Sequence, residues 1–469
     1  MSALHDQRGI TMIKQITTAA LLSTALFQPA FAEEAPASTM TVEERVYGLS
    51  NFWREVTYNF AHWQVVPDLD WDKAYKEALP KIINAKSDFD YFMELKKLCA
   101  QLKDGHTNIY FPEGMVDKNR DRFPLQLKSI NSRAIVENMA KAYAEKIPRG
   151  SEILEVDGKP VGKMMEEDIY PYISTSAPHM YPIIAIGSYH RLGVGVLTGA
   201  NDSVGTLLIE TPEGEKRTIK LPRNQNDGDV DWAYTNERPE IVEFKWLDDG
   251  QAYIALNSFG REEVVDGFKT HLPELHKAKS IVVDLRENGG GSGAYAAEIL
   301  KSFTDKPFYS STWKTPVHKG AHKAWGKYAD MAESLEKYRE YYEGHPMEEH
   351  EPEPFVPEAG DKLNVPTAFL ISSSTASAAE DILIMADDIE HITMIGEPTY
   401  GSTGQPLMMD LPAGGQARVS TKRDYYRDGK EFIGVGVLPD ITVKQTVSGL
   451  RKGKDEVLQK AMDFLKASE

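Results

Sequence analysis

The chain has 469 residues, of which 41% are hydrophobic and 10% aromatic, so it can bury a large core and is not a disordered tail. Its 71 acidic residues outnumber its 53 basic residues, which gives a formal net charge of -18. A surface of this sign repels a phosphate backbone or an anionic membrane, so the composition argues against nucleic acid as a partner.

The first residues have the features of a secretory signal peptide. Lys14 precedes the apolar run ITTAALLSTALF, and Ala30-Phe31-Ala32 has the small-x-small form that signal peptidase recognises. The run is shorter than the roughly 20 residues that a bilayer span requires, and no later segment is long enough. We therefore expect residues 1–32 to be removed, leaving an exported protein, periplasmic or secreted, with no stable membrane span.

Three helices are predicted after the signal, in TVEERVYGLSNFWREVTYNF, WDKAYKEALPKIINA and DFDYFMELKKLCAQL. The first opens with Thr41 and Glu44 in the arrangement of a capping box. The third contains Cys99, the single cysteine, on its apolar face, which predicts a buried, inert thiol and excludes an intrachain disulfide. We assign residues 33–115 to an N-terminal helical domain.

Short strands and turns follow, from about Phe123. An Asp157-Gly158 turn and a hairpin around Pro212-Glu213-Gly214 predict a second, mostly β module at residues 120–224. The acidic, asparagine-rich PRNQNDGDVD after it is typical of a linker.

The rest of the chain, residues 230–469, alternates strands and helices. The predicted strands are AYIALNSF, IVVDL, TAFLI and ITMIG, and the helices cover 261–278 and begin near Ala294 and Ser377. This order predicts an α/β domain with a largely parallel sheet covered by helices. A polar segment at 307–360 interrupts it and is predicted to be a surface insertion.

The glycine run in IVVDLRENGGGSGA has three interpretations on pattern alone. It can be a degenerate dinucleotide fingerprint, an oxyanion hole made of backbone amides, or a tight turn without a ligand. No basic or ribose-recognising residue is evident that would support the first interpretation.

Two other stretches carry groups suited to nucleophilic catalysis. His106 lies in LKDGHTNIYFP, in a polar turn at the junction before the β module, where clefts form between domains. SSSTASAAED, residues 372–381, leads from a buried strand into a helix, a geometry that presents nucleophilic serines in unrelated hydrolases. Serines in such a place are also common helix caps and turn residues.

Five stretches favour a catalytic role over simple helix capping. In chain order they are DGHT, DLRENGGG, STASAAED, GEPTYGSTGQ and GVGVLPDI. Together they resemble the C-terminal-processing, or tail-specific, serine peptidase family, in its tricorn-core-like branch. The resemblance covers residues 41 to 445. It implies a ClpP/crotonase-like α/β catalytic domain and a PDZ-like module, which residues 123–222 fit, although the glycine-rich loop that binds a peptide carboxylate is not evident there.

The resemblance also implies roles for individual residues. The family's nucleophile precedes a small-small-Glu triplet, here Ala378-Ala379-Glu380, and therefore corresponds to Ser377. Gly290 or Gly291, with the amide of Ala378, corresponds to the oxyanion hole. Ser402 stands where the processing proteases have a lysine, so the tricorn-like branch, with His106 as general base, fits better.

The chain departs from that branch at two positions, and the third member of the triad is unassigned. Gly105 stands where relatives can have a serine, and Ile433 where they have a glutamate. Asp388, 11 residues beyond the nucleophile, matches an aspartate of the lysine branch. We take Asp388, Glu380 and Ser402 as candidate supporting residues.

The resulting hypothesis is an exported serine peptidase that acts on peptides or unfolded protein segments without a cofactor. No metal site is expected either, although His318 and His322 have helical i, i+4 spacing in HKGAH. The alternative is a non-catalytic protein of the same fold that binds a peptide or an apolar ligand. The sequence leaves the oligomeric state open.

Overall fold

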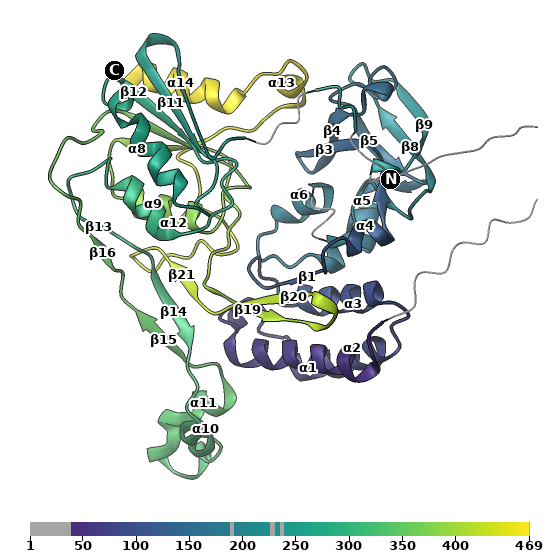
Figure 1. Ribbon diagram of the computed structural model, residues 1–469. Coiled ribbons are helices and arrows are strands. Elements are labelled where there is room, and N and C mark those ends of the chain that lie inside the picture. The colour runs from purple at the N-terminus through teal and green to yellow at the C-terminus, as the bar shows by residue number, and fades with distance from the viewer. Residues whose placement is uncertain (1–38, 188–191, 226–229, 235–238, 469) are drawn as a thin grey trace, which may run out of the picture. The chain divides into compact units, whose positions relative to one another are not determined.

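The computed structural model describes residues 39–187, 192–225, 230–234 and 239–468 (Figure 1). The predicted signal peptide lies outside the described residues. Within the described ranges, no helix is both long enough and apolar enough to cross a membrane.

The N-terminal helices lie where the sequence predicts them: α1 (Val42–Asn59), α2 (Trp71–Ile83) and α3 (Asp88–Ala100). The capping box is present, with the Glu44 amide donating to Thr41 Oγ1 at 3.1 Å and the Thr41 amide donating to Glu44 Oε2 at 2.8 Å. Cys99 is buried in α3, as predicted.

The core of these helices includes residues from near the other end of the chain. Strands β19 (Pro406–Asp410) and β20 (Gln416–Ser420) form a sheet with β1 (Asn108–Tyr110), in the order β1-β20-β19. Leu411, Ala417 and Val419 from this hairpin pack into the helical core. The segment around β1, which follows the His106 turn, is thereby fixed to the C-terminal part of the chain.

The second module is an antiparallel sheet in the order β3-β4-β5-β8-β9, with β6 paired to β5. Its strands are β3 (Leu125–Ile130), β4 (Arg133–Met139), β5 (Glu152–Val156), β6 (Lys159–Pro160), β8 (Val204–Glu210) and β9 (Lys216–Pro222). Its smaller elements are α4 (Met115–Asn119), α5 (Val161–Met164), α6 (Met180–Gly187), β2 (Asp121–Arg122) and β7 (Thr198–Gly199). The predicted β8–β9 hairpin is confirmed. That the module is PDZ-like stays a prediction.

The third sheet has the order β10-β11-β12-β17-β18-β22 and is parallel except at β10, which confirms the mixed α/β architecture (Figure 1). Its strands are β10 (Val242–Trp246), β11 (Gln251–Leu256), β12 (Ser280–Asp284), β17 (Thr367–Ile371), β18 (Ile392–Gly396) and β22 (Ile441–Thr442). The helices of this part are α8 (Glu263–Leu275), α9 (Gly293–Leu300), α12 (Ala378–Ala386), α13 (Val447–Arg451) and α14 (Glu456–Ser468).

Alternate residues of the central strands enter two different cores. Val283 and Phe369 pack with α8, α9 and α12, whereas Val282 and Leu370 pack with α14. Because successive side chains of a strand point to opposite faces, helices cover both faces of this sheet. This burial on both faces explains the nearly uninterrupted apolar runs from which these strands are predicted in the sequence.

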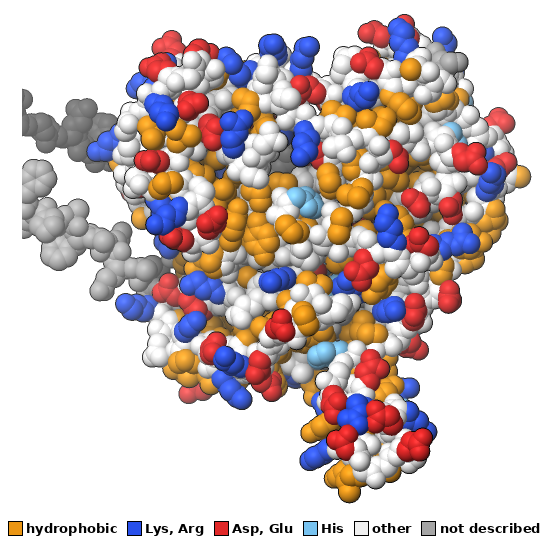
Figure 2. All heavy atoms as spheres, turned by 180° about the vertical axis from the view of Figure 1, so that it is seen from behind, with side chains coloured by type: hydrophobic (Ala, Val, Ile, Leu, Met, Phe, Trp, Pro, Cys, Tyr) orange, Lys and Arg blue, Asp and Glu red, His pale blue; other side chains and the backbone are white. Residues whose placement is uncertain are grey.

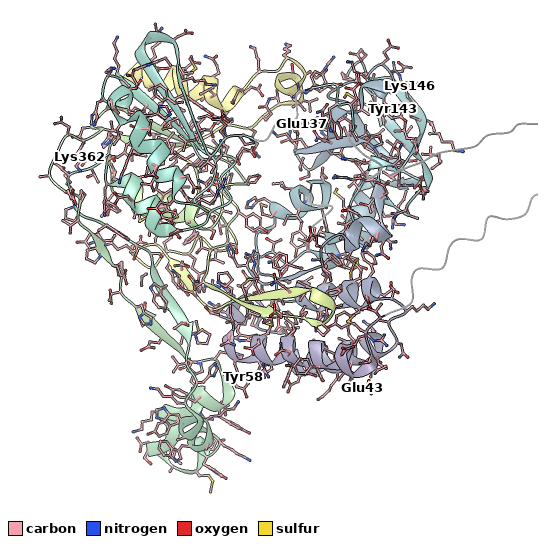
Figure 3. All side chains as sticks on the ribbon, viewed as in Figure 1. Glu43, Tyr58, Glu137, Tyr143, Lys146 and Lys362 are labelled. Carbon is pink, nitrogen blue, oxygen red and sulfur yellow. The ribbon has the colours of Figure 1, made fainter. Side chains whose placement is uncertain are left out.

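The insertion at 307–360 forms an arm that projects beyond the sheets (Figure 1). It contains β13 (Phe308–Tyr309), β14 (Thr312–Pro316), α10 (Gly320–Gly326), α11 (Arg339–Glu343), β15 (Met347–His350) and β16 (Pro354–Phe355), and β14 also pairs with β21 (Arg423–Tyr425). Near its base, His318 packs edge-on against Tyr58 of α1, which is labelled in Figure 3, with ring centroids 5.2 Å apart. His322 instead packs against Tyr338 and Tyr341 of the arm. In the described part of the chain, no group of three or more histidine, cysteine or acidic side chains is arranged to hold a metal.

Candidate active site

Ser377 occupies a strained turn between a buried strand and a helix. Strand β17 ends at Ile371 and α12 begins at Ala378, and Ser377 between them has φ 56° and ψ -126°. A positive φ in a residue other than glycine costs about 1–3 kcal/mol and persists only where the surroundings fix it. The Ser377 amide donates to Glu380 Oε2 at 3.1 Å, and the Ala376 amide donates to the carbonyl of Asn288 at 3.1 Å. The turn thus holds Ser377 at the N-terminal end of α12.

The glycine run predicted to carry an oxyanion hole lies directly against this turn. A Cβ on Gly290 would be 2.7 Å from Cβ of Ser377 and 3.0 Å from the amide nitrogen of Ala378, so only glycine allows this approach. The Gly290 amide itself donates to Asn288 Oδ1 at 2.9 Å. Of the two candidate glycines, Gly291 is therefore the one whose amide is not engaged by Asn288, and it lines the same cavity as Ser377.

His106 and Ser377 line one cavity of about 600 Å³, although they come from opposite ends of the chain. His106 belongs to the turn that precedes β1, and the pairing of β1 with β20 fixes that turn beside the α/β domain. The cavity is also lined by apolar side chains of α6, namely Met180, Ile183 and Ile184. Both sequence-predicted catalytic groups thus face a shared cavity of the size that binds a small ligand or a few residues of a peptide.

One ring nitrogen of His106, Nδ1, is hydrogen-bonded to Ser402. His106 Nδ1 lies 2.7 Å from Ser402 Oγ, and Ser402 Oγ in turn donates to Asp104 Oδ1 at 3.3 Å. Thr107 donates to the second oxygen of Asp104 at 2.7 Å. The three side chains form a buried chain that runs from the imidazole through a hydroxyl to a carboxylate.

The charge of Asp104 decides the direction of these hydrogen bonds. Burial alone would raise the pKa of Asp104, but the neighbouring His62 and His106 and the bond from Thr107 lower this pKa below its usual value. An ionised carboxylate only accepts, so Ser402 uses its single proton on Asp104 and must accept from Nδ1–H of His106. In this tautomer the lone pair that a general base requires is on Nε2 of His106.

Ser402 also explains why position 105 is a glycine. A Cβ on Gly105 would lie 2.9 Å from both Cβ and Oγ of Ser402, and 2.5 Å from the ring of Tyr400. A serine at position 105, which relatives in the resembled family can have, would compete for the space that Ser402 already fills. The hydroxyl beside the histidine is present here, but a different segment supplies it.

Glu380 connects the Ser377 turn to the loop that carries Ser402. Its Oε2 accepts from the amides of Ser377 and Ser402, at 3.1 and 3.2 Å. Its Oε1 accepts from the Gly401 amide at 2.8 Å and from Thr399 Oγ1 at 2.5 Å. Burial raises the pKa of Glu380 to about 8 although these donors oppose the shift. One buried carboxyl group therefore sets the position of Ser377 relative to Ser402.

Glu380 and Ser402 form hydrogen bonds to the Ser377 turn and to His106, whereas Asp388, the third candidate supporting residue, lies beyond the other end of α12. It follows the C-terminal end of α12, whereas Ser377 precedes the N-terminal end of that helix. Its side chain is 82% exposed and makes a 3.5 Å ion pair with Arg427. Asp104 is the carboxylate that sequence reasoning missed, although it lies within the DGHT stretch, two residues before His106.

The chain is similar in sequence to known peptidases. The model of Peptidase family S41 matches residues 250–443. The chain is 23% identical over 254 residues to the carboxy-terminal-processing protease of Bartonella bacilliformis, with 53% of this chain and 51% of that protein covered. It is also 23% identical over 248 residues to the carboxy-terminal processing protease CtpA of Bacillus subtilis, covering 52% of this chain and 46% of that protein. The chain thus spans about half the length of the curated relatives it matches.

Solved structures support the fold. The structure of mature CPAF complexed with lactacystin has a TM-score of 0.67 and 14% identity, and the match covers 91% of this chain and 98% of that chain. Mature CPAF alone gives a TM-score of 0.66 with the same identity and coverage of 91% and 97%. At 14% identity, these TM-scores show a shared fold alone.

Proposed function

We propose that this chain, whose residues 250–443 match the model of Peptidase family S41, is a serine peptidase that hydrolyses peptides or unfolded protein segments. The observation that carries the proposal is the shared cavity of Ser377 and His106, together with the hydrogen-bond chain behind the histidine. Neither a glycine run nor a serine turn would suffice without these partners. The match to the family model supports the resemblance drawn from the five motifs.

In the first step Ser377 Oγ attacks the carbonyl carbon of the scissile bond, and Nε2 of His106 takes the hydroxyl proton. The imidazolium that forms is stabilised by the Ser402 hydroxyl, which accepts from Nδ1–H, and by the negative charge of Asp104 behind that hydroxyl. Bond formation between Oγ and carbon converts the carbonyl oxygen into an oxyanion. The amides of Gly291 and Ala378 are our candidates for its donors.

Collapse of the tetrahedral intermediate breaks the carbon–nitrogen bond, and His106 delivers its proton to the leaving amine. An acyl ester on Ser377 remains. Water then attacks this ester with His106 again accepting the proton, which releases the carboxylic acid product and restores the serine. No metal or organic cofactor takes part in any of these steps.

Labelling with a fluorophosphonate probe tests the proposal most directly, since the probe reacts only with an activated serine. We expect the folded mature protein to be labelled at Ser377, and Ser377→Ala and His106→Ala to abolish the label. Ser374→Ala is the matched control, because Ser374 is on the same loop and lines the same cavity, and the bond from its amide to Ser372 Oγ survives the substitution. A folded protein that takes no label and cleaves no peptide would favour the alternative function, non-catalytic binding of a peptide or apolar ligand.

We also propose that the protein is exported, from the signal-like sequence at residues 1–32. Expression of the full chain in a bacterium, followed by N-terminal sequencing of the exported form, should give a mature protein beginning near Glu33. Retention of an intact N-terminus in the cytoplasm would contradict the proposal.

A further inference from the structure

Arg418 introduces a positive charge into the cavity of Ser377 and His106. It lies on β20, directly opposite Asn108 of β1, and it lines that cavity. Charged side chains of both signs are spread over the face of the molecule shown in Figure 2, but among the described residues that line this cavity Arg418 is the charged side chain that accompanies His106.

The guanidinium of Arg418 has few partners among the residues that the structure describes. One of its terminal nitrogens donates to the carbonyl of Gly105 at 3.2 Å, and its Cζ lies over the ring of Tyr110, 5.6 Å from the ring centroid. Its Nε is buried and has no hydrogen-bond partner among the described residues. Arg286 and Arg423, which are also half-buried or buried, each have a carboxylate within 3 Å, and no such ion pair is found for Arg418 in the described ranges.

The bond to Gly105 does not account for the position of the arginine. The same carbonyl already accepts from Asn108 Nδ2 at 2.7 Å, so it is satisfied without Arg418. A guanidinium has five donors in a planar fork that matches a carboxylate, and such pairs are frequently bidentate. Arg418 is partly buried and has no carboxylate partner in the described part of the chain, so this capacity is unused there.

We propose that Arg418 binds a carboxylate of the substrate and so makes the peptidase selective for peptides that carry a negative charge beside the cleaved bond. This inference rests on the proposed function of the same cavity. The apolar side chains of Met180, Ile183 and Ile184 select the neighbouring substrate side chains, so the substrate class is a peptide with bulky apolar residues next to a carboxylate. The carboxylate belongs either to a free C-terminus or to an aspartate or glutamate side chain.

Binding to the Ser377→Ala protein separates recognition from catalysis. The probes are three fluorescent decapeptides of alanine and leucine: one with a free C-terminal carboxylate, one with a C-terminal amide, and one amidated peptide with a central glutamate. We expect at least one carboxylate peptide to bind roughly 10- to 100-fold more tightly than the neutral amide, the usual effect of a charged hydrogen bond. Which of the two binds tightly identifies the source of the carboxylate.

Substitution of the arginine tests its part in that preference. Arg418→Gln should reduce the affinity for the preferred peptide to that of the neutral amide, and Arg418→Lys should retain part of the difference. Arg427→Gln is the matched control, since Arg427 is exposed and pairs with Asp388 away from the cavity. Equal affinity for all three peptides, no binding of any, or a preference that survives Arg418→Gln would each overturn the inference.

The failure of this inference is distinguishable from failure of the proposed function. If fluorophosphonate labels Ser377 and the protein cleaves acidic and neutral peptides at equal rates, the peptidase stands and carboxylate selection is wrong. If the carboxylate preference holds in binding while no serine is labelled, the cavity binds carboxylate peptides without the chemistry.

Discussion

Replacing Asp104 by asparagine tests the hydrogen-bond chain behind His106 with little change of shape. The ionised Asp104 can only accept from Ser402. An asparagine amide can instead donate to Ser402 Oγ, which then uses its own proton on Nδ1 of His106. Nε2 would carry the proton in that arrangement and could no longer accept one from Ser377.

The magnitude follows from the geometry. The two bonds of 2.7 and 3.3 Å place the carboxylate within about 6 Å of the imidazole. At an effective dielectric constant of about 20, a charge at about 6 Å stabilises the imidazolium by about 3 kcal/mol, which corresponds to roughly 100-fold in rate. The wrong tautomer adds to this loss, because an equivalent change in serine proteases lowers kcat by about 10⁴-fold. We therefore expect Asp104→Asn to reduce kcat by about 10²- to 10⁴-fold.

The assay is steady-state hydrolysis of a quenched fluorescent peptide, with thermal melting to confirm that each variant is folded. Ser402→Ala removes the bridge itself, so the double variant with Asp104→Asn should be little worse than the poorer single variant. Asp388→Asn is the matched control and should retain full activity, since Asp388 is exposed and outside the cavity. Rate losses that multiply in the double variant, or an Asp104→Asn enzyme within threefold of wild type, would refute the reasoning.

Three further predictions concern the turn, the glycine loop and the buried carboxyl group. Ser377→Gly should raise the free energy of unfolding by about 1 kcal/mol, because glycine accepts the positive φ, while Ser377→Ala should not; equal melting temperatures would contradict this. Gly291→Ala should lower the free energy of unfolding in denaturant by more than about 4 kcal/mol, because its Cβ would lie 2.1 Å from the backbone of Phe259. Gly289→Ala is the control, since nothing lies within 4 Å of a Cβ on Gly289, and a stable Gly291→Ala protein would refute the prediction. The pKa of Glu380 is about 8 in the folded protein, above the ordinary 4.5, so the contribution of Glu380 to stability is complete below about pH 4.5 and is lost as the pH rises towards 8. The melting temperature of Glu380→Gln should lack this decline, and the same pH dependence in both proteins would disprove the prediction.

The parts of the fold that depend on residues close together in the sequence could be predicted, and those that depend on distant residues could not. Strand β17 was predicted at Thr367–Ile371 and β18 at Ile392–Gly396, with bounds that agree with the structure, because strands covered on both faces are uninterrupted apolar runs. The capping box of α1 depends on two residues three positions apart. The pairing of β1 with β20 was not foreseen, since neither short strand carries any sign of its distant partner.

The candidate site shows the same division between local and distant determinants. Ser377 and His106 were found through sequence motifs, and each motif is a short continuous segment. The carboxylate was sought after the nucleophile, at Asp388, because the resembled lysine branch has one there. Asp104 acts through Ser402, which arrives from the far end of the chain, so the link between them exists only in three dimensions.

The hydrogen bonds of Glu380 also explain how it supports the site although it does not line the cavity. Both the Ser377 amide and the Ser402 amide donate to the same oxygen of Glu380, so the nucleophile's turn and the histidine's partner are positioned by one atom. The strain at Ser377 persists because this carboxyl group and the Asn288 carbonyl fix the turn on both sides of the serine. Movement of Glu380 would therefore shift the nucleophile and the support of the base together. The glutamate of the small-small-Glu triplet is thus a geometric requirement, since from the first turn of α12 its side chain reaches back to both backbone segments.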